Sequence, residues 1–220
     1  MLKAVLFDMD GVIVDTEPLH KKAYFQMFDE VGITVSQSLY NSYTGQSTIT
    51  ICRDLCDRYS LSEAPETLVA KKRKHFKQLF DTDTSLQLLP GVLELIKNYK
   101  KNDLTLVLAS SASMPNIERI FERFQLNPYF KGKVSGADLK QSKPHPEIFQ
   151  KAAAIAGANR SQCMVIEDAT NGIKAAKAAG IYCVAYKSTH SKNQEYTLAD
   201  KVISDFSEIE FEKISTEFTS

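Results

Sequence analysis

The chain has 220 residues, which is enough for one large domain or two small ones. Its hydrophobic fraction of 43% can supply a substantial core, and 27 basic residues balance 27 acidic ones. The zero net charge argues against a nucleic-acid-binding or membrane-surface protein, and no apolar run is long enough to span a bilayer.

Short apolar runs with high β-propensity recur along the chain, and helical patterns separate most of them. The predicted strands are Ala4–Asp8, Leu104–Ser110, Lys133–Ser135, Cys163–Asp168, Tyr182–Tyr186 and Lys201–Ser204. The helices predicted between them are Met114–Phe124, Pro146–Ala156 and Gly172–Ala179. The runs are apolar rather than alternating, which is typical of a parallel sheet covered on both faces. This order predicts an α/β fold with a doubly wound, Rossmann-like parallel sheet.

The stretch from Glu17 to Leu86 interrupts this order because it contains no convincing strand. Helical patterns cover Pro18–Val31, Ser47–Tyr59 and Pro65–Phe80 instead. An insert of this size after the first strand is too large for an ordinary connection between a strand and a helix. We therefore predict a helical-bundle cap domain over residues 17–86, inserted into an α/β core formed by residues 1–16 and 87–220.

The cysteines and one run of basic residues have ordinary structural interpretations. Cys52, Cys56, Cys163 and Cys183 lack the tight spacing of a metal site, and no signal peptide is visible. We expect reduced, mostly buried thiols in a cytoplasmic protein, and nothing indicates an obligate protein partner. A redox or metal role for Cys52 and Cys56, which would share a helix face, stays open. The basic run Lys71–Lys74 is expected to form a solvated helix face.

Asp8 and Asp10 stand at the end of the first apolar run, before Gly11. Residues i and i+2 of a strand share a face, and two unscreened carboxylates on a buried face would repel each other. The strand should therefore end near Asp8, where Gly11 supplies freedom for a turn, and we expect Asp8 to face solvent. Ligands bind at the carboxyl ends of the strands in such sheets, and a divalent cation would make the paired charge tolerable. An acidic turn or helix cap is the ordinary alternative.

Polar side chains also occur at three later points of the predicted core. Ser110 and Ser111 follow the second strand, Lys143 precedes a helix, and Glu167 and Asp168 end a later strand. Consecutive strands would bring these positions to one edge of the sheet. Acids suit a cation, whereas a hydroxyl and an ammonium group suit phosphate oxygens. Each residue alone fits a helix cap or a surface charge, but their joint occurrence indicates a metal and phosphate site.

With these residues assembled, the chain resembles the haloacid dehalogenase superfamily of phosphotransferases, which use an aspartate nucleophile. The matching residues, in the family's order, are Asp8-Met9-Asp10-Gly11-Val12, Ser110, Lys143-Pro144 and Glu167-Asp168. The helical insert resembles the cap of the β-phosphoglucomutase-like branch. Residues 15–20, 143–146 and 168–173 also fit that branch.

The resemblance implies a catalytic role for both aspartates of the first motif. Asp8 would attack phosphorus and become an aspartyl phosphate. Asp10 would protonate the leaving oxygen and then activate water as a general base. Burial and the neighbouring Asp8 would raise the proton affinity that Asp10 needs as an acid.

The resemblance also implies three sets of binding residues. Mg²⁺ would be held by the Asp8 carboxylate, the Asp10 backbone carbonyl and Asp168, with Glu167 assisting. Ser110, Ser111 and Lys143 would hold the transferring phosphoryl group. Substrate specificity would depend on the cap, at His20 and at Gly45, Gln46 and Thr48 in the turn of residues 43–48.

The resulting hypothesis is a Mg²⁺-dependent phosphohydrolase for a small phosphorylated metabolite, such as a sugar phosphate. The alternative is a β-phosphoglucomutase that interconverts glucose 1-phosphate and glucose 6-phosphate. Asp10 argues against a dehalogenase, which needs neither magnesium nor a second acid. A response-regulator-like switch is disfavoured because its phosphorylated aspartate follows a later strand.

The cap turn favours hydrolysis over the mutase reaction. The mutase resemblance calls for a lysine before the glycine of this turn and an arginine three residues after it. This chain has Thr44 and Thr48 at those positions. A threonine cannot replace the charge or the bidentate grip of an arginine on phosphate. Arg53 and the run Lys71–Lys77 are the cations that could substitute from elsewhere in the cap.

Overall fold

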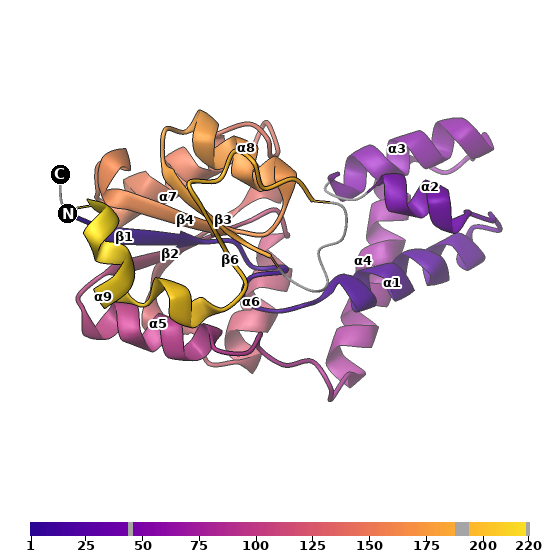
Figure 1. The fold of residues 1–220 in the computed structure, drawn as a ribbon. Coiled ribbons are helices and arrows are strands. Elements are labelled where there is room, and N and C mark those ends of the chain that lie inside the picture. The colour runs from indigo at the N-terminus through magenta and orange to yellow at the C-terminus, as the bar shows by residue number, and fades with distance from the viewer. Residues whose placement is uncertain (44–45, 188–193, 219–220) are drawn as a thin grey trace. The chain divides into compact units, whose positions relative to one another are not determined.

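The structure, a computed structural model, describes residues 1–43, 46–187 and 194–218. The chain divides into two compact units, which we call the core (Met1–Asp15 and Gln87–Ser220) and the cap (Thr16–Leu86). The core contains the β-sheet, and the cap is helical (Figure 1). Across the described ranges, no helix combines the length and the apolar character that a membrane crossing requires.

Six parallel strands form one sheet in the order β3-β2-β1-β4-β5-β6. They are β1 (Ala4–Phe7), β2 (Thr105–Ser110), β3 (Phe130–Ser135), β4 (Cys163–Glu167), β5 (Tyr182–Tyr186) and β6 (Lys201–Ile203). The predicted doubly wound parallel sheet is therefore confirmed. β3 begins at Phe130 rather than at Lys133, because an edge strand is half-solvated and tolerates the polar residues that hid its first half.

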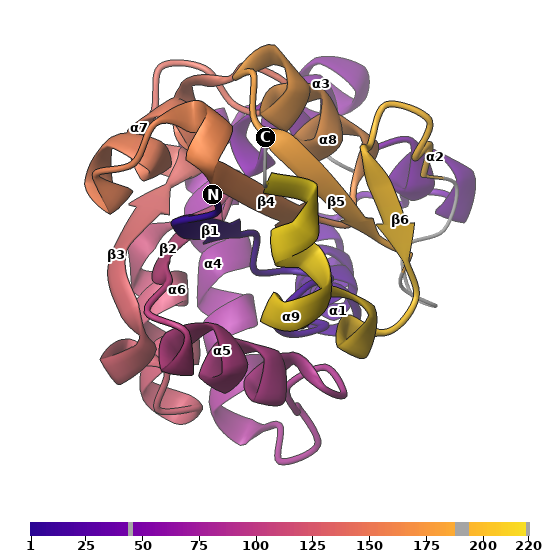
Figure 2. The same cartoon turned by 60° about the vertical axis from the view of Figure 1, so that its left-hand side comes forward.

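Helices cover both faces of this sheet. On one face lie α5 (Val92–Lys101) and α6 (Met114–Arg123), and on the other lie α7 (Glu147–Ala156) and α8 (Thr170–Ala178) (Figure 2). Alternate residues of β1 serve the two faces. Leu6 belongs to the apolar cluster with α7 and α8, whereas Phe7 meets Tyr99 of α5 edge-on, with ring centroids 6.3 Å apart. Both faces are covered, which explains why β1 is apolar throughout.

The cap consists of α1 (Glu17–Glu30), α2 (Gln37–Ser42), α3 (Thr48–Tyr59) and α4 (Pro65–Thr82). Its own apolar cluster includes Met27 of α1, Leu55 of α3 and Leu68 of α4. The sequence did not predict α2, since six residues are too few to show a helical period. Its start is nevertheless defined locally, because Ser36 Oγ accepts a hydrogen bond from the Leu39 backbone N–H at 3.2 Å.

The chain after β6 folds back against α5. It contains a 3₁₀ turn (Phe206–Ile209), the short helix α9 (Phe211–Ile214) and a second turn (Ser215–Phe218). Further 3₁₀ turns are Asn127–Tyr129, Gly136–Asp138 and Arg160–Gln162. The buried Tyr99 hydroxyl donates a hydrogen bond to the Ile209 carbonyl at 2.6 Å, and Asn98 Oδ1 accepts one from the Phe211 N–H at 2.9 Å. Two side chains of α5 therefore attach this last segment to the core.

We predict that Tyr99→Phe lowers the free energy of unfolding by about 1–3 kcal/mol, because the Ile209 carbonyl would lose its buried donor. Urea denaturation followed by circular dichroism measures the change. Tyr129→Phe, which alters a partly exposed tyrosine, is the matched control. Equal stability of the two variants would show that this hydrogen bond does not hold the segment.

Candidate active site

Three strand ends and one loop meet around the ammonium group of Lys143. Its Nζ lies 2.5 Å from Asp8 Oδ1 and 2.6 Å from Glu167 Oε1. It also donates to the Ala109 carbonyl at 3.1 Å. The register explains the convergence: Phe7 of β1 pairs with Leu108 of β2 and Ile166 of β4, so the next residue of each strand lies at the same edge. Lys143 reaches this edge from the loop before α7.

Asp8 is buried, with only 6% of its surface exposed, so the expectation that it faces solvent is wrong. Burial raises the pKa of Asp8 to about 7, and the charges of Glu167 and Asp10 add to this effect. The ammonium of Lys143 opposes the rise. Burial alone would lower the pKa of Lys143, but Asp8 and Glu167 outweigh it and hold that pKa above its ordinary value. The strand can end in a buried acid because a buried cation accompanies it.

The carboxylate of Glu167 is fixed on both oxygens. Oε1 accepts from Lys143, and Oε2 accepts from the backbone N–H groups of Asp168 and Ala169, each at 2.9 Å. A Cβ atom at Gly172, in the first turn of α8, would overlap this carboxylate. Position 172 therefore requires a residue without a Cβ atom, because Glu167 occupies that space. The sequence did not reveal this role.

Asp8, Glu167 and Asp168 form a buried acidic cluster in which one oxygen from each residue lies within 4.8 Å of the others. Carboxylate oxygens in this arrangement are the ligand type that Mg²⁺ prefers. Both oxygens of Glu167 are already held, by Lys143 and by two backbone N–H groups. Gly11, at φ +85°, leaves room beside Asp168, because a Cβ atom there would overlap its carboxylate. The residues present therefore fit a hard divalent cation.

The other site residues expected in the core are Asp10, Ser110 and Ser111, which stand at or just after the carboxyl ends of β1 and β2. Asp10 is half-buried in the turn after β1, where Gly11 N–H donates to the Val14 carbonyl at 2.7 Å. Its charge acts on Asp8, but its carboxylate is outside the three-acid cluster. Ser110 is buried, and its Oγ accepts from the Ala112 N–H at 3.1 Å. Ser111 is exposed.

Within the cap, the buried Lys72 contacts the half-buried His20, with Lys72 Nζ 2.7 Å from His20 Nδ1. The ammonium can only donate, so Nδ1 accepts and the imidazole is neutral. Burial lowers the pKa of His20, and the Lys72 charge lowers it further. Lys72 is only 4% exposed, so the predicted solvated face is wrong at this position. Its spacing with Leu68, Phe76 and Phe80 on α4 was the signal that could have placed it on the buried face.

The expected specificity turn is described only in part, because Thr44 and Gly45 lie outside the described residues. Gln46 Nε2 donates to the Ser42 carbonyl at 3.2 Å, which ties this side chain to the end of α2. The Thr48 hydroxyl is hydrogen-bonded to Tyr24. The Tyr24 ring in turn lies 4.8 Å from Lys72 Nζ. Thr48 therefore contacts Tyr24, and Tyr24 contacts Lys72, which is the partner of His20.

All four cysteines are free, and Cys52, Cys163 and Cys183 are buried, as expected for reduced core thiols. Burial raises the pKa of Cys163 to about 11. A thiol with a raised pKa is a poor nucleophile and a poor metal ligand at neutral pH.

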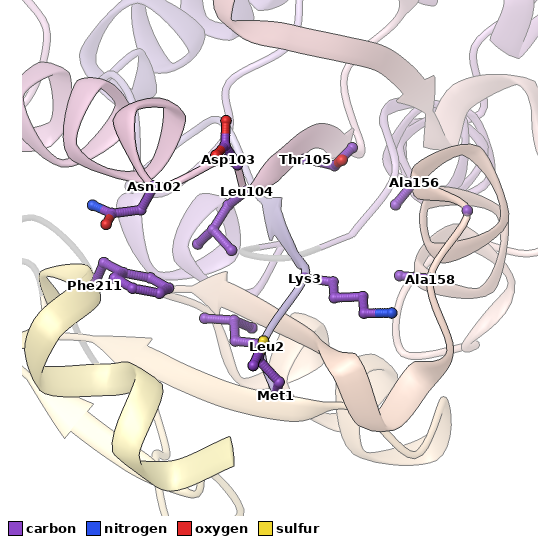
Figure 3. Close-up of a pocket in the computed structure, with 11 residues that line it drawn as sticks. Met1, Leu2, Lys3, Asn102, Asp103, Leu104, Thr105, Ala156, Ala158 and Phe211 are labelled. Carbon is purple, nitrogen blue, oxygen red and sulfur yellow. The ribbon is translucent and has the colours of Figure 1, made fainter. Parts of the chain in front are cut away.

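A pocket of about 330 Å³ lies at the opposite edge of the sheet (Figure 3). It is lined by residues 1–3, 102–105 and 156–158 and by Phe211. The first two stretches precede β1 and β2, so the pocket lies at the amino ends of the strands. It is separate from the acidic cluster, which follows their carboxyl ends.

The fold and the site define a class: a doubly wound α/β protein with a buried acidic cluster and a lysine at the carboxyl edge of the sheet. A model of the haloacid dehalogenase-like hydrolase family matches residues 5–186. The chain belongs to this family, and the predicted resemblance is confirmed.

Individual relatives include enzymes that are named for phosphorylated sugars. It is 30% identical to β-phosphoglucomutase of Bacillus subtilis, over 99% of this chain and 96% of that protein. It is 31% identical to a phosphorylated carbohydrates phosphatase of Thermotoga maritima, over 90% of this chain and 91% of that protein. A crystal structure of β-phosphoglucomutase from Clostridium difficile superposes with a TM-score of 0.85 at 26% identity, covering 99% of this chain and 97% of that one.

We predict that Gly172→Ala destabilises the protein by about 1–3 kcal/mol, because the new methyl group would displace the buried Glu167 carboxylate. Lys174→Ala, at an exposed position of the same helix, is the control. Chemical denaturation of both variants measures the difference. If Gly172→Ala matched the control, the close contact between Gly172 and Glu167 would not constrain the site.

Proposed function

We propose that this protein is a Mg²⁺-dependent phosphohydrolase that acts on a small phosphorylated metabolite, such as a sugar phosphate, through an aspartyl-phosphate intermediate. The observation that carries the proposal is the Asp8 carboxylate, held by Lys143 within the acidic cluster of Glu167 and Asp168. Membership of the haloacid dehalogenase-like hydrolase family supports it.

Asp8 is the proposed nucleophile. Lys143 holds its Oδ1, so the carboxylate has a fixed position from which to attack phosphorus. The hydroxyls of Ser110 and Ser111 would donate to phosphoryl oxygens, and the Lys143 ammonium would join them by exchanging its contact with the Ala109 carbonyl. Attack forms the aspartyl phosphate and breaks the bond between phosphorus and the leaving oxygen.

Asp10 is the proposed general acid and base. It would give a proton to the leaving oxygen and then take one from the water that hydrolyses the aspartyl phosphate. The position of Asp10 in the turn after β1, two residues beyond Asp8, supports this assignment.

Mg²⁺ would be held by the carboxylates of Asp8 and Asp168, which belong to the acidic cluster, and by the Asp10 backbone carbonyl, with Glu167 supporting them. The cation would supply positive charge that offsets the repulsion between Asp8 and the phosphate dianion. The residues of the site would hold the cation in place. Glu167 would help indirectly, because its hydrogen bonds to Lys143 and to the start of α8 fix its own carboxylate beside the site.

Substrate selection is assigned to the cap. His20, Gly45, Gln46 and Thr48 are the proposed specificity residues, and Lys72 joins them through its contact with His20. A neutral imidazole beside a buried ammonium offers a donor and a positive charge to a hydroxylated, anionic substrate. The free cysteines support the further proposal of a cytoplasmic location.

The β-phosphoglucomutase reaction is the second candidate, and the 30% identity to the Bacillus subtilis enzyme favours it. A mutase must hold a bisphosphate by its non-reacting phosphate. The threonines at positions 44 and 48 remove two cations that would serve this purpose. We therefore favour water as the acceptor of the phosphoryl group.

We predict that Asp8→Asn abolishes turnover and leaves the protein folded. The amide lacks the charge for attack, whereas Lys143 would keep its ion pair with Glu167. The assay is Mg²⁺-dependent release of phosphate from p-nitrophenyl phosphate, with circular dichroism as the folding control. Single-turnover release near the rate of the unmodified protein would contradict the nucleophile assignment.

We predict that Asp10→Asn lowers turnover by roughly two to four orders of magnitude, as for loss of a general acid and base. The same phosphate-release assay measures it. A loss below about tenfold would indicate that Asp10 only shapes the turn.

The hydrolase and mutase hypotheses differ in their products. We predict that β-glucose 1-phosphate, given with a trace of the 1,6-bisphosphate, yields inorganic phosphate with little glucose 6-phosphate. Both products are followed in the same reaction. Glucose 6-phosphate that appears much faster than phosphate would reverse the choice and establish the mutase.

A further inference from the structure

The hydroxyl of Tyr196 is buried and has no hydrogen-bond partner among the described residues. Part of the ring packs against the apolar cluster formed with α7 and α8. A buried hydroxyl without a partner is unusual, because it gives up hydrogen bonds to water and gains none in the protein. The proposed catalytic steps assign no role to this group.

The segment that carries Tyr196 is attached to the start of α8. Gln194 Oε1 accepts hydrogen bonds from the Thr170 backbone N–H at 2.8 Å and from the Thr170 hydroxyl at 2.9 Å. The Glu195 N–H donates to Thr170 Oγ1 at 2.8 Å. Thr170 stands two residues after Asp168, so these bonds fix the segment beside the acidic cluster.

Tyr196 follows Gln194 and Glu195, the two residues that are hydrogen-bonded to Thr170. Burial raises the pKa of Tyr196, and the Asp168 charge raises it further. Within the part of the chain that the structure describes, no direct hydrogen bond reaches the Tyr196 hydroxyl. A buried polar group without a protein partner is commonly satisfied by a water molecule.

We propose that Tyr196 is a positioning residue whose hydroxyl hydrogen-bonds a water molecule in the coordination shell of the Mg²⁺ held by Asp168. The inference rests on the proposed function, which places Mg²⁺ in this cluster. Mg²⁺ normally keeps several of its waters, and those waters need partners in the protein. Groups that orient metal ligands from outside change metal affinity by about 10–100-fold when they are removed. The Gln194–Thr170 contact ties the segment that carries Tyr196 to the start of α8.

The test measures Mg²⁺ binding itself, by isothermal titration calorimetry with MgCl₂ as the probe. Tyr196→Phe keeps the ring and removes the hydroxyl, and we expect its Mg²⁺ affinity to fall by about tenfold or more. Tyr129→Phe removes a hydroxyl that precedes β3, and its affinity should not change. In chelator, neither variant should melt below the unmodified protein, because without the metal the Tyr196 hydroxyl has no partner to lose among the described residues, whereas loss of a structural hydrogen bond would lower the melting temperature.

Gln194→Ala provides a second measurement. It removes the hydrogen bonds between residue 194 and Thr170, whereas Tyr196 keeps its hydroxyl group. Its Mg²⁺ affinity should also fall, even if Tyr196→Phe proves unstable. Unchanged affinity in both variants, with weaker binding in Asp168→Asn, would overturn the role of Tyr196 and leave the proposed metal site intact. If the unmodified protein and Asp168→Asn both fail to bind Mg²⁺, the metal site and the role of Tyr196 are overturned together.

Discussion

The arrangement of the polar edge of the core depends on the ammonium group of Lys143. Asp8 and Glu167 end neighbouring strands and are both buried, so without a cation they would repel each other in a poorly solvated place. Lys143 contacts both carboxylates and the Ala109 carbonyl, and thereby joins the ends of β1, β2 and β4. A single side chain from a loop thus makes the charged ends of these strands compatible with the sheet.

Two glycines complete this arrangement from the backbone side. Gly11 leaves the space that the Asp168 carboxylate occupies, and Gly172 leaves the space for Glu167. The acids are therefore held by steric fit as well as by charge. This precision matters for phosphoryl transfer, where most of the catalysis comes from positioning and electrostatic stabilisation.

The cap carries its own buried cation. Lys72 contacts the imidazole of His20 and lies over the rings of Tyr24 and Phe76. Aromatic faces and a neutral histidine lower the cost of burying an ammonium group. The threonines at positions 44 and 48 separate this chain from the mutase pattern, and Lys72 supplies a buried charge inside the helical unit.

The sequence by itself determined the sheet and the order of its motifs. Both faces of β1 are covered, so its residues are uniformly apolar, and the acids stand at the ends of β1 and β4, where a cation can reach them. Local pattern also found α1, α3 and α4, but it missed α2, α9 and the start of β3, which are short or polar and depend on neighbouring elements. Only the tertiary structure decided that Asp8 is buried against Lys143, that Gly172 makes room for Glu167, and that Lys72 lies inside the cap. Each of these is a contact between residues far apart in the chain, and the free energy of such a contact depends on neighbours that no local sequence window contains.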